Sequence, residues 1–161
     1  MKLRVAFRDL EPTDLGDLGW SGGAEHLRAV SEALQAAYAG EVALVVATLK
    51  NGRLVGLGAV DLHDHEVGRI WMLAVHETVQ GLGIGSRLIT ELENRTAAAG
   101  LSTARLLVEH DNPLARSLYT RLGYREVASV VDGWPVAGGR RFVTVSTVME
   151  RALPRSGRSP H

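Results

Sequence analysis

The chain has 161 residues, of which 45% are hydrophobic, and its 18 basic residues are balanced by 18 acidic ones. This length suits one domain with a sizeable core, and the hydrophobic content excludes a wholly disordered chain. The zero formal net charge argues against non-specific nucleic-acid binding, and the absence of cysteine excludes disulfides, thiolate metal sites and a cysteine nucleophile.

The sequence of the first half of the chain predicts a strand, a helix and three further strands. Alternation over residues 3–9 predicts a strand with one buried face, and apolar residues at helical spacing over 24–38 predict an amphipathic helix. Three strands follow, over residues 42–49, 54–62 and 67–75. The last of them is almost continuously apolar, which is typical of a central strand buried on both faces.

The second half alternates helices with strands. Apolar residues at four-residue spacing predict a helix that starts at Ile84 and is ended by Gly100. Residues 104–108 are again typical of a strand. Asn112, a capping residue followed by proline, starts a further helix. We expect that helix to bury an apolar stripe made of Leu114, Leu118 and Leu122.

Two last strands, over residues 124–131 and 141–149, enclose a Gly/Pro loop over 132–139. The order β-α-β-β-β-α-β-α-β-β predicts an α/β (α+β) fold with a mixed, mostly antiparallel central sheet of about seven strands, flanked by helices. We expect a single domain over residues 1–152 and a flexible C-terminal tail over 153–161.

A glycine-rich segment, Gln80-Gly81-Leu82-Gly83-Ile84-Gly85-Ser86, joins the buried strand to the helix that follows it. Alternating glycines let the backbone point several N–H groups into one concavity at a helix N-terminus, which is a favourable site for phosphate. Arg87 adds a positive charge nearby. The simpler alternative is that the glycines only cap the turn. The sequence disfavours a P-loop, because the chain has no Gly-Lys pair, and a dinucleotide site, because the glycine spacing departs from that fingerprint.

Two motifs resemble those of a known family. Gln80-x-x-Gly83-x-Gly85, after Leu73-Ala74-Val75, resembles the acyl-CoA pyrophosphate motif of the GNAT superfamily of N-acyltransferases. Asn112-x-x-Ala115-x-x-Leu118-Tyr119-x-x-Leu122-Gly123-Tyr124 resembles a second signature of the same family. The motifs cover about residues 66–125, and the order of the elements extends the likeness to residues 3–150.

The resemblance implies a GNAT-like sheet with splayed central strands and acetyl-CoA, the acyl donor, in the cleft between them. Its pantetheine would pair with the main chain of Leu73, Ala74 and Val75, and its pyrophosphate would lie on the N–H groups from Gln80 to Ser86. Backbone groups freed by splaying need a strand-like partner, which agrees with this arrangement. The resemblance further implies that Asn112 bonds the pantetheine arm, with Ala115 and Arg116 beside it.

Tyr119 matches the residue that usually protonates the departing thiolate in this family. A tyrosine with its ordinary pKa of about 10 is protonated at neutral pH and can donate. The alternative is that Tyr119 only packs against the bound cofactor. A backbone N–H near Leu73 is placed to polarise the thioester carbonyl, as an oxyanion donor does.

The sequence leaves three alternatives for the general base that deprotonates the amine. Many family members carry a glutamate eleven residues before the glutamine of the phosphate motif, and Arg69 stands at that position here. Glu66 and His110 are candidate bases, and deprotonation of the amine by bulk water is the third alternative. The short cluster His63-x-His65-Glu66 falls in a turn, so we expect no metal site there.

We therefore predict an N-acetyltransferase that moves an acetyl group from acetyl-CoA to a primary amine by direct transfer in a ternary complex. The acceptor is a small-molecule or peptide amine, and a homodimer is compatible with the sequence. The alternative is a non-catalytic acyl-CoA-binding sensor or interaction domain, which Arg69 keeps open. No apolar segment approaches the roughly 20 residues of a membrane span, so we expect a cytoplasmic protein without a membrane or nucleic-acid partner.

Overall fold

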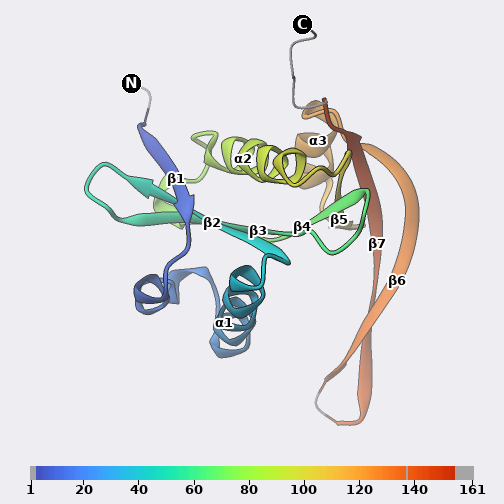
Figure 1. The fold of residues 1–161 in the computed structure, drawn as a ribbon. Coiled ribbons are helices and arrows are strands. Elements are labelled where there is room, and N and C mark those ends of the chain that lie inside the picture. The colour runs from blue at the N-terminus through green and yellow to red at the C-terminus, as the bar shows by residue number, and fades with distance from the viewer. Residues whose placement is uncertain (1–2, 137, 155–161) are drawn as a thin grey trace, which may run out of the picture.

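The structure is a computed structural model that describes residues 3–136 and 138–154 (Figure 1). Its centre is a seven-stranded sheet with the order β1-β2-β3-β4-β5-β7-β6. The strands are β1 (Val5–Asp9), β2 (Val42–Leu49), β3 (Leu54–Asp61), β4 (Val67–Val75), β5 (Thr103–Glu109), β6 (Arg125–Val136) and β7 (Arg140–Ala152). Every neighbouring pair is antiparallel except β4 and β5, which confirms the predicted mixed sheet.

The helices lie on both faces of this sheet (Figure 1). They are α1 (Ala24–Tyr38), α2 (Ile84–Ala98), α3 (Pro113–Arg121) and three short 3-10 helices, Pro12–Asp17, Gly19–Ser21 and Glu77–Val79. In Figure 1, α2 and α3 lie above the sheet and α1 lies below it. No helix of the described residues is long and apolar enough to cross a membrane.

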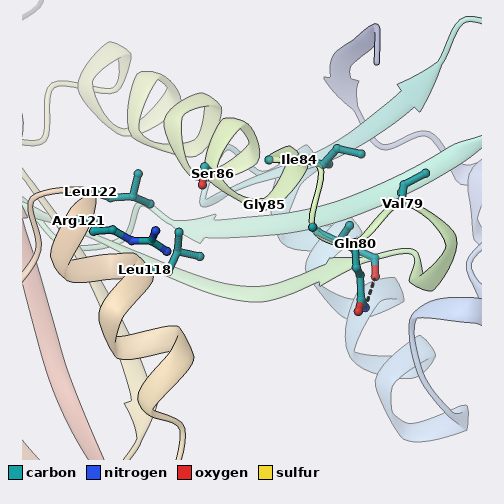
Figure 2. Close-up of a pocket in the computed structure, with 11 residues that line it drawn as sticks. Val79, Gln80, Ile84, Gly85, Ser86, Leu118, Arg121 and Leu122 are labelled. Atoms are coloured by element: carbon teal, nitrogen blue, oxygen red, sulfur yellow. Dashed lines mark hydrogen bonds between the residues drawn. The ribbon is translucent and has the colours of Figure 1, made fainter. Parts of the chain in front are cut away.

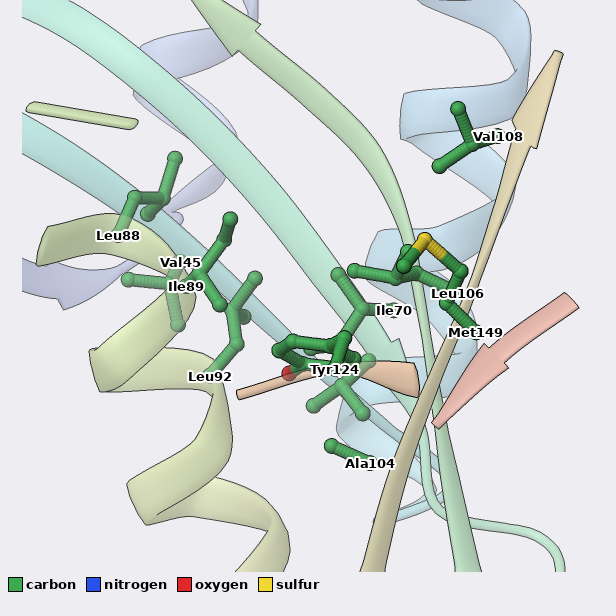
Figure 3. Close-up of a cluster of buried hydrophobic side chains, with 11 residues drawn as sticks. Val45, Ile70, Leu88, Ile89, Leu92, Ala104, Leu106, Val108, Tyr124 and Met149 are labelled. Atoms are coloured by element: carbon green, nitrogen blue, oxygen red, sulfur yellow. The ribbon is translucent and has the colours of Figure 1, made fainter. Parts of the chain in front are cut away.

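The main core lies between α2 and the sheet. Leu88, Ile89 and Leu92 of α2 are at most 2% exposed and pack among strand residues that include Ile70 and Leu106 (Figure 3). The apolar stripe predicted for this helix is therefore confirmed, and it fixes α2 across β3 and β4. A Cβ at Gly58 would lie 2.8 Å from the end of the Leu92 side chain, so a larger residue at this strand position would force Leu92 to shift.

The C-terminal hairpin is longer than predicted. Residues 132–136, expected in a loop, continue β6, and the pairing with β7 extends to Val136 opposite Arg140. Pro135 is tolerated there because β6 is an edge strand of the sheet. Leu153, expected in the tail, donates its N–H to Ser102 O at 2.8 Å and packs on the core, while residues 155–161 lie outside the described part.

The central strands separate at a defined point. Val67–Arg69 of β4 pair with Thr103–Arg105 of β5, and no further pairing between these two strands occurs among the described residues. The prediction that β4 is buried on both faces is wrong, since only Gly68 and Ile70 are fully buried, whereas Arg69 is exposed and Trp71 is 37% exposed. Both exposed side chains point to the face opposite α2, where α1 covers β2 and β3.

Candidate functional site

A pocket of about 620 Å³ lies where the glycine-rich loop faces α3 (Figure 2). It is lined by Val75, Val79, Gln80, Gly81, Gly83, Ile84, Gly85, Ser86, Leu118, Arg121 and Leu122. Thus six of the seven loop residues singled out in the sequence line one cavity. Leu82, the seventh, is 59% exposed and borders a separate hollow beside β1.

The loop has a geometry that suits an anion. Gly81 and Gly83 have φ of +79° and +81°, a left-handed conformation that favours glycine. Gly83 is the N-cap of α2 and supplies no side-chain hydrogen bond, so the first N–H groups of the helix stay available. The Nε2 of Gln80 donates to Val75 O at 3.1 Å and ties the loop to the end of β4 (Figure 2). These features fit the pyrophosphate of acyl-CoA.

The facing wall of this pocket comes from α3. Leu118 and Leu122 are half-buried and line the pocket together with Arg121. The predicted buried stripe is wrong for Leu114, which is 83% exposed, and no residue of α3 is fully buried. The helix borders a cleft and does not pack into the core along its whole length.

Arg121, which the sequence reasoning missed, is the cation of this pocket. Arg87, expected in that role, donates instead to Leu3 O and Val5 O at 3.4 and 3.3 Å. Its guanidinium also lies 5.6 Å from the centre of the Phe7 ring. Arg87 is thus held against β1 and away from α3. The helical spacing of Arg121 from Leu118 is the signal that places both on one face.

A second pocket, of about 510 Å³, occupies the opening between β4 and β5. It is lined by Asp61, Arg69, Ile70, Trp71, Met72, Leu73, Leu106, Leu107 and Tyr119. Tyr119 comes from the face covered by α2 and α3, whereas Arg69, Trp71 and Leu107 belong to the opposite face. The opening therefore joins the two faces of the sheet.

A β-bulge in β4 lies at this opening. Leu57 pairs with Ala74 and Ala59 with Trp71, so Gly58 alone faces both Met72 and Leu73. Met72 has φ of +64° and is the sole non-glycine residue with positive φ among those described. Backbone strain of this kind persists where surrounding structure enforces it. The bulge turns the peptide groups of Met72 and Leu73 out of the regular ladder, next to Tyr119 in the same pocket.

Tyr119 is half-buried and packs against the main core. Its ring lies 6.2 Å from that of Tyr124 in an edge-to-face arrangement. Burial raises the pKa of Tyr119 above its ordinary value, because the low-dielectric surroundings disfavour the phenolate. The phenol therefore stays protonated at neutral pH.

Three residues that the resemblance places beside the pantetheine arm, Asn112, Ala115 and Arg116, lie outside both pocket linings. Asn112 Oδ1 accepts the N–H of Ala115 at 3.2 Å and so caps α3. Arg116 forms an ion pair with Glu126 at 2.5 Å, and Ala115 packs against the main core.

The two candidate bases are exposed and lie outside both pocket linings. The backbone O of Glu66 accepts from Ser102 and Thr103, at the closed end of the β4–β5 pair. His110 follows β5, and its Nδ1 lies 3.4 Å from Thr147 Oγ1. No group of three metal-ligating side chains occurs among the residues that the structure describes.

Known proteins share this architecture. Residues 8–124 match the model of the acetyltransferase (GNAT) family. Two curated relatives are mycothiol acetyltransferases, from Streptomyces avermitilis (38% identical over 76 residues, 47% of this chain) and Gordonia bronchialis (37% over 84 residues, 52%). The matched segments span about a quarter of the length of these relatives (25% and 27%).

Solved structures cover the chain more fully. Spermidine N-acetyltransferase from Vibrio cholerae, in complex with CoA and spermine, has a TM-score of 0.76 at 18% identity, over 94% of this chain and 96% of that one. Ribosomal-protein-S18-alanine N-acetyltransferase from Escherichia coli has a TM-score of 0.66 at 19% identity, over 98% and 99%. At such identities these structures establish the fold. Because the family model matches residues 8–124, which are most of the chain, the chain belongs to the acetyltransferase (GNAT) family.

Proposed function

We propose that the protein transfers an acetyl group from acetyl-CoA directly to a primary amine. The observation that carries the proposal is the opening between β4 and β5, which holds a strained bulge and a protonated tyrosine in one pocket. An enzyme of this kind must bring a thioester and an amine together from two sides, and this opening joins the two faces of the sheet.

The donor would be held along the cleft by groups that have already been described. The N–H groups between Gln80 and Ser86 and the guanidinium of Arg121 would hold its pyrophosphate. Backbone groups of Leu73 to Val75, freed where β4 leaves β5, would pair with the amide groups of its pantetheine arm. Acetyl-CoA supplies the activated acetyl group as a thioester. Asn112, Ala115 and Arg116 would border the same arm at the start of α3.

Tyr119 would act as the proton donor. As the amine nitrogen forms its bond to the acetyl carbon, the carbon–sulfur bond breaks and the sulfur leaves as a thiolate. The Tyr119 hydroxyl, kept protonated by its raised pKa, donates its proton to that thiolate. The nitrogen loses one proton as the amide forms, and the Tyr119 phenolate regains a proton, directly or through solvent. The N–H of Leu73 at the bulge would stabilise the carbonyl oxygen as negative charge develops there.

The amine must be neutral before it attacks. Glu66 and His110 stay the proposed side-chain bases, either directly or through water, with solvent as the alternative. Both are exposed, so a proton released to either can pass to solvent. An enzyme that depends on solvent deprotonation should show a rate that rises with pH up to the pKa of its amine.

A CoA-binding sensor is the second candidate, and Arg69 in place of the family's usual glutamate favours it. One experiment distinguishes the transferase from the sensor. The protein is mixed with acetyl-CoA and a panel of small amines and peptides, and thiol release is followed with a thiol-reactive dye. Since the chain lacks cysteine, it adds no thiol of its own. Amine-dependent release supports the transferase, whereas CoA binding without release from any amine supports the sensor.

A further inference from the structure

We propose that Arg69 binds a carboxylate of the acceptor, so that the acceptors of this protein are primary amines that also carry a carboxylate. This inference rests on the proposed function and names the substrate class of the same site. It starts from the face of the sheet by which an acceptor can reach the opening between β4 and β5.

That face is the one opposite α2 and α3. The glycine-rich loop and α3 form the donor pocket, so the donor occupies their side of the sheet. The opening leads to the other face, where α1 packs against β2 and β3 and leaves Trp71 and Leu107 exposed beside the opening, at 37% and 44%. An acceptor that approaches from there meets the side chains that point away from α2.

Arg69 is one of these side chains. Gly68 lies against Thr96 of α2, so the next residue along β4 points to the opposite face. Arg69 is exposed and lines the pocket that contains Tyr119. It is also the last residue of β4 that pairs with β5, which places it at the edge of the opening.

The guanidinium of Arg69 has no carboxylate partner among the described residues. Arg105, its neighbour on β5, is neutralised by Glu150 at 2.6 Å. Asp61, its neighbour on β3, accepts the N–H of His63 at 2.9 Å and caps that turn. Asp61 lines the same pocket but makes no ion pair with Arg69. Arg69 therefore presents guanidinium N–H groups that no carboxylate of the described residues engages, in a planar fork suited to a carboxylate.

Apart from Arg69, Asp61 and Tyr119, the wall of this pocket is apolar. Trp71 and Leu107 flank the opening on the acceptor face and would contact an apolar body of the acceptor. A polyamine would bring a second ammonium group towards Arg69, which carries a charge of the same sign, and the one carboxylate of this lining, Asp61, already accepts the N–H of His63. The chemistry of the wall thus favours an amino acid with an apolar side chain over a diamine.

The test uses pairs of amines that differ only in the carboxylate: phenylalanine with 2-phenylethylamine, leucine with 3-methylbutylamine, and methionine with 3-(methylthio)propylamine. Thiol release gives kcat/KM for each amine, with spermidine as the polycationic comparison. We expect at least one pair in which the carboxylate raises kcat/KM by about 10- to 100-fold, the usual value of a charged hydrogen bond. Arg69→Gln should bring that ratio to about one, and Arg69→Lys should restore part of it.

Arg53→Gln is the matched control, since Arg53 is an exposed arginine at the β2–β3 hairpin and should leave the ratio unchanged. Calorimetric titration with CoA checks that Arg69→Gln still folds and binds the donor. Equal rates within every pair, a preference for spermidine, or a carboxylate preference that survives in Arg69→Gln would overturn the inference and leave the transferase standing. Absence of thiol release with every amine would refute the transferase itself, and the inference with it.

Discussion

The hydroxyl of Tyr124 donates to Oε2 of Glu93 at 2.6 Å, deep in the core of the protein. Glu93 and Tyr124 are 6% and 2% exposed, and Nη1 of Arg151 donates to the other carboxylate oxygen, also at 2.6 Å. One buried carboxylate of α2 thus connects that helix to β7 and to Tyr124, the residue before β6. The ring of Tyr124 also supports that of Tyr119, so this network lies directly behind the proposed proton donor.

Tyr124→Phe should lower the free energy of unfolding by about 1–3 kcal/mol, because it leaves a buried carboxylate oxygen without its donor. The variant keeps the ring and its packing, so cavity formation does not contribute. Urea unfolding measures the change. Tyr38→Phe is the control, since Tyr38 is 65% exposed and its loss of a hydroxyl should have little effect. An equal effect of the two substitutions would show that the bond to Glu93 does not stabilise the fold.

The same bond predicts a loss of stability at alkaline pH. Burial, and then the hydrogen bond to Glu93, raise the pKa of Tyr124 well above its ordinary value of 10.0. The contribution of this bond to the free energy of unfolding is complete below pH 10. It declines as pH rises further, because Tyr124 ionises at a lower pH in the unfolded chain than in the folded one. The decline reaches about 1.4 kcal/mol per pH unit. The difference in stability between wild type and Tyr124→Phe should therefore shrink above pH 10. A difference that stays constant up to pH 11.5 would contradict this assignment.

Gly83→Ala should weaken CoA binding by more than tenfold. Gly83 has φ of +81°, which costs an alanine about 1–2 kcal/mol, and its new methyl group would project into the region of the proposed anion site. Gly52→Ala provides the comparison, because Gly52 has φ of +84° and equally open space around its Cα, but lies in the β2–β3 hairpin. Both variants should lose similar stability, and Gly83→Ala alone should lose affinity for CoA. Equal affinity in the two would remove this loop from the donor site.

The glycine-rich loop and the bulge in β4 show which parts of the candidate site could be predicted from the sequence. The loop from Gln80 to Ser86 is a local feature, so its composition and its place before α2 were enough to predict its geometry. The bulge at Met72 was not predictable, because it depends on Gly58 of the neighbouring strand. The same holds for Glu93 and Tyr124, which are 31 residues apart and meet only in the folded chain.

The hydrophobic periodicity of α3 did not predict its burial correctly. The leucine pattern predicted a buried stripe, but a helix that borders a ligand cleft has the same pattern as one that packs on a core. Leu114 is consequently exposed, and Arg121, which lines the pocket on that helix, was overlooked. Position within the fold, and not hydrophobicity, distinguishes the two cases.

Arg121→Gln should weaken CoA binding by about tenfold and reduce its dependence on salt, since a phosphate contact from an arginine is electrostatic. Titrations at low and at physiological ionic strength measure both effects. Arg125→Gln is the control, because Arg125 is an exposed arginine at the start of β6 and lies outside the pocket lining. If the two variants bind CoA with the same affinity, Arg121 does not contact the donor.

Rapid mixing of the protein with acetyl-CoA, followed by addition of an amine, tests direct transfer most plainly. A cysteine-free chain with a proton donor at Tyr119 predicts no thiol release before the amine is added, and continuous release afterwards. Tyr119→Phe should lower kcat by about 100-fold or more and leave CoA affinity unchanged. A burst of thiol equal to the protein concentration before any amine is added would contradict direct transfer. Release that stays absent with every amine would contradict the transferase.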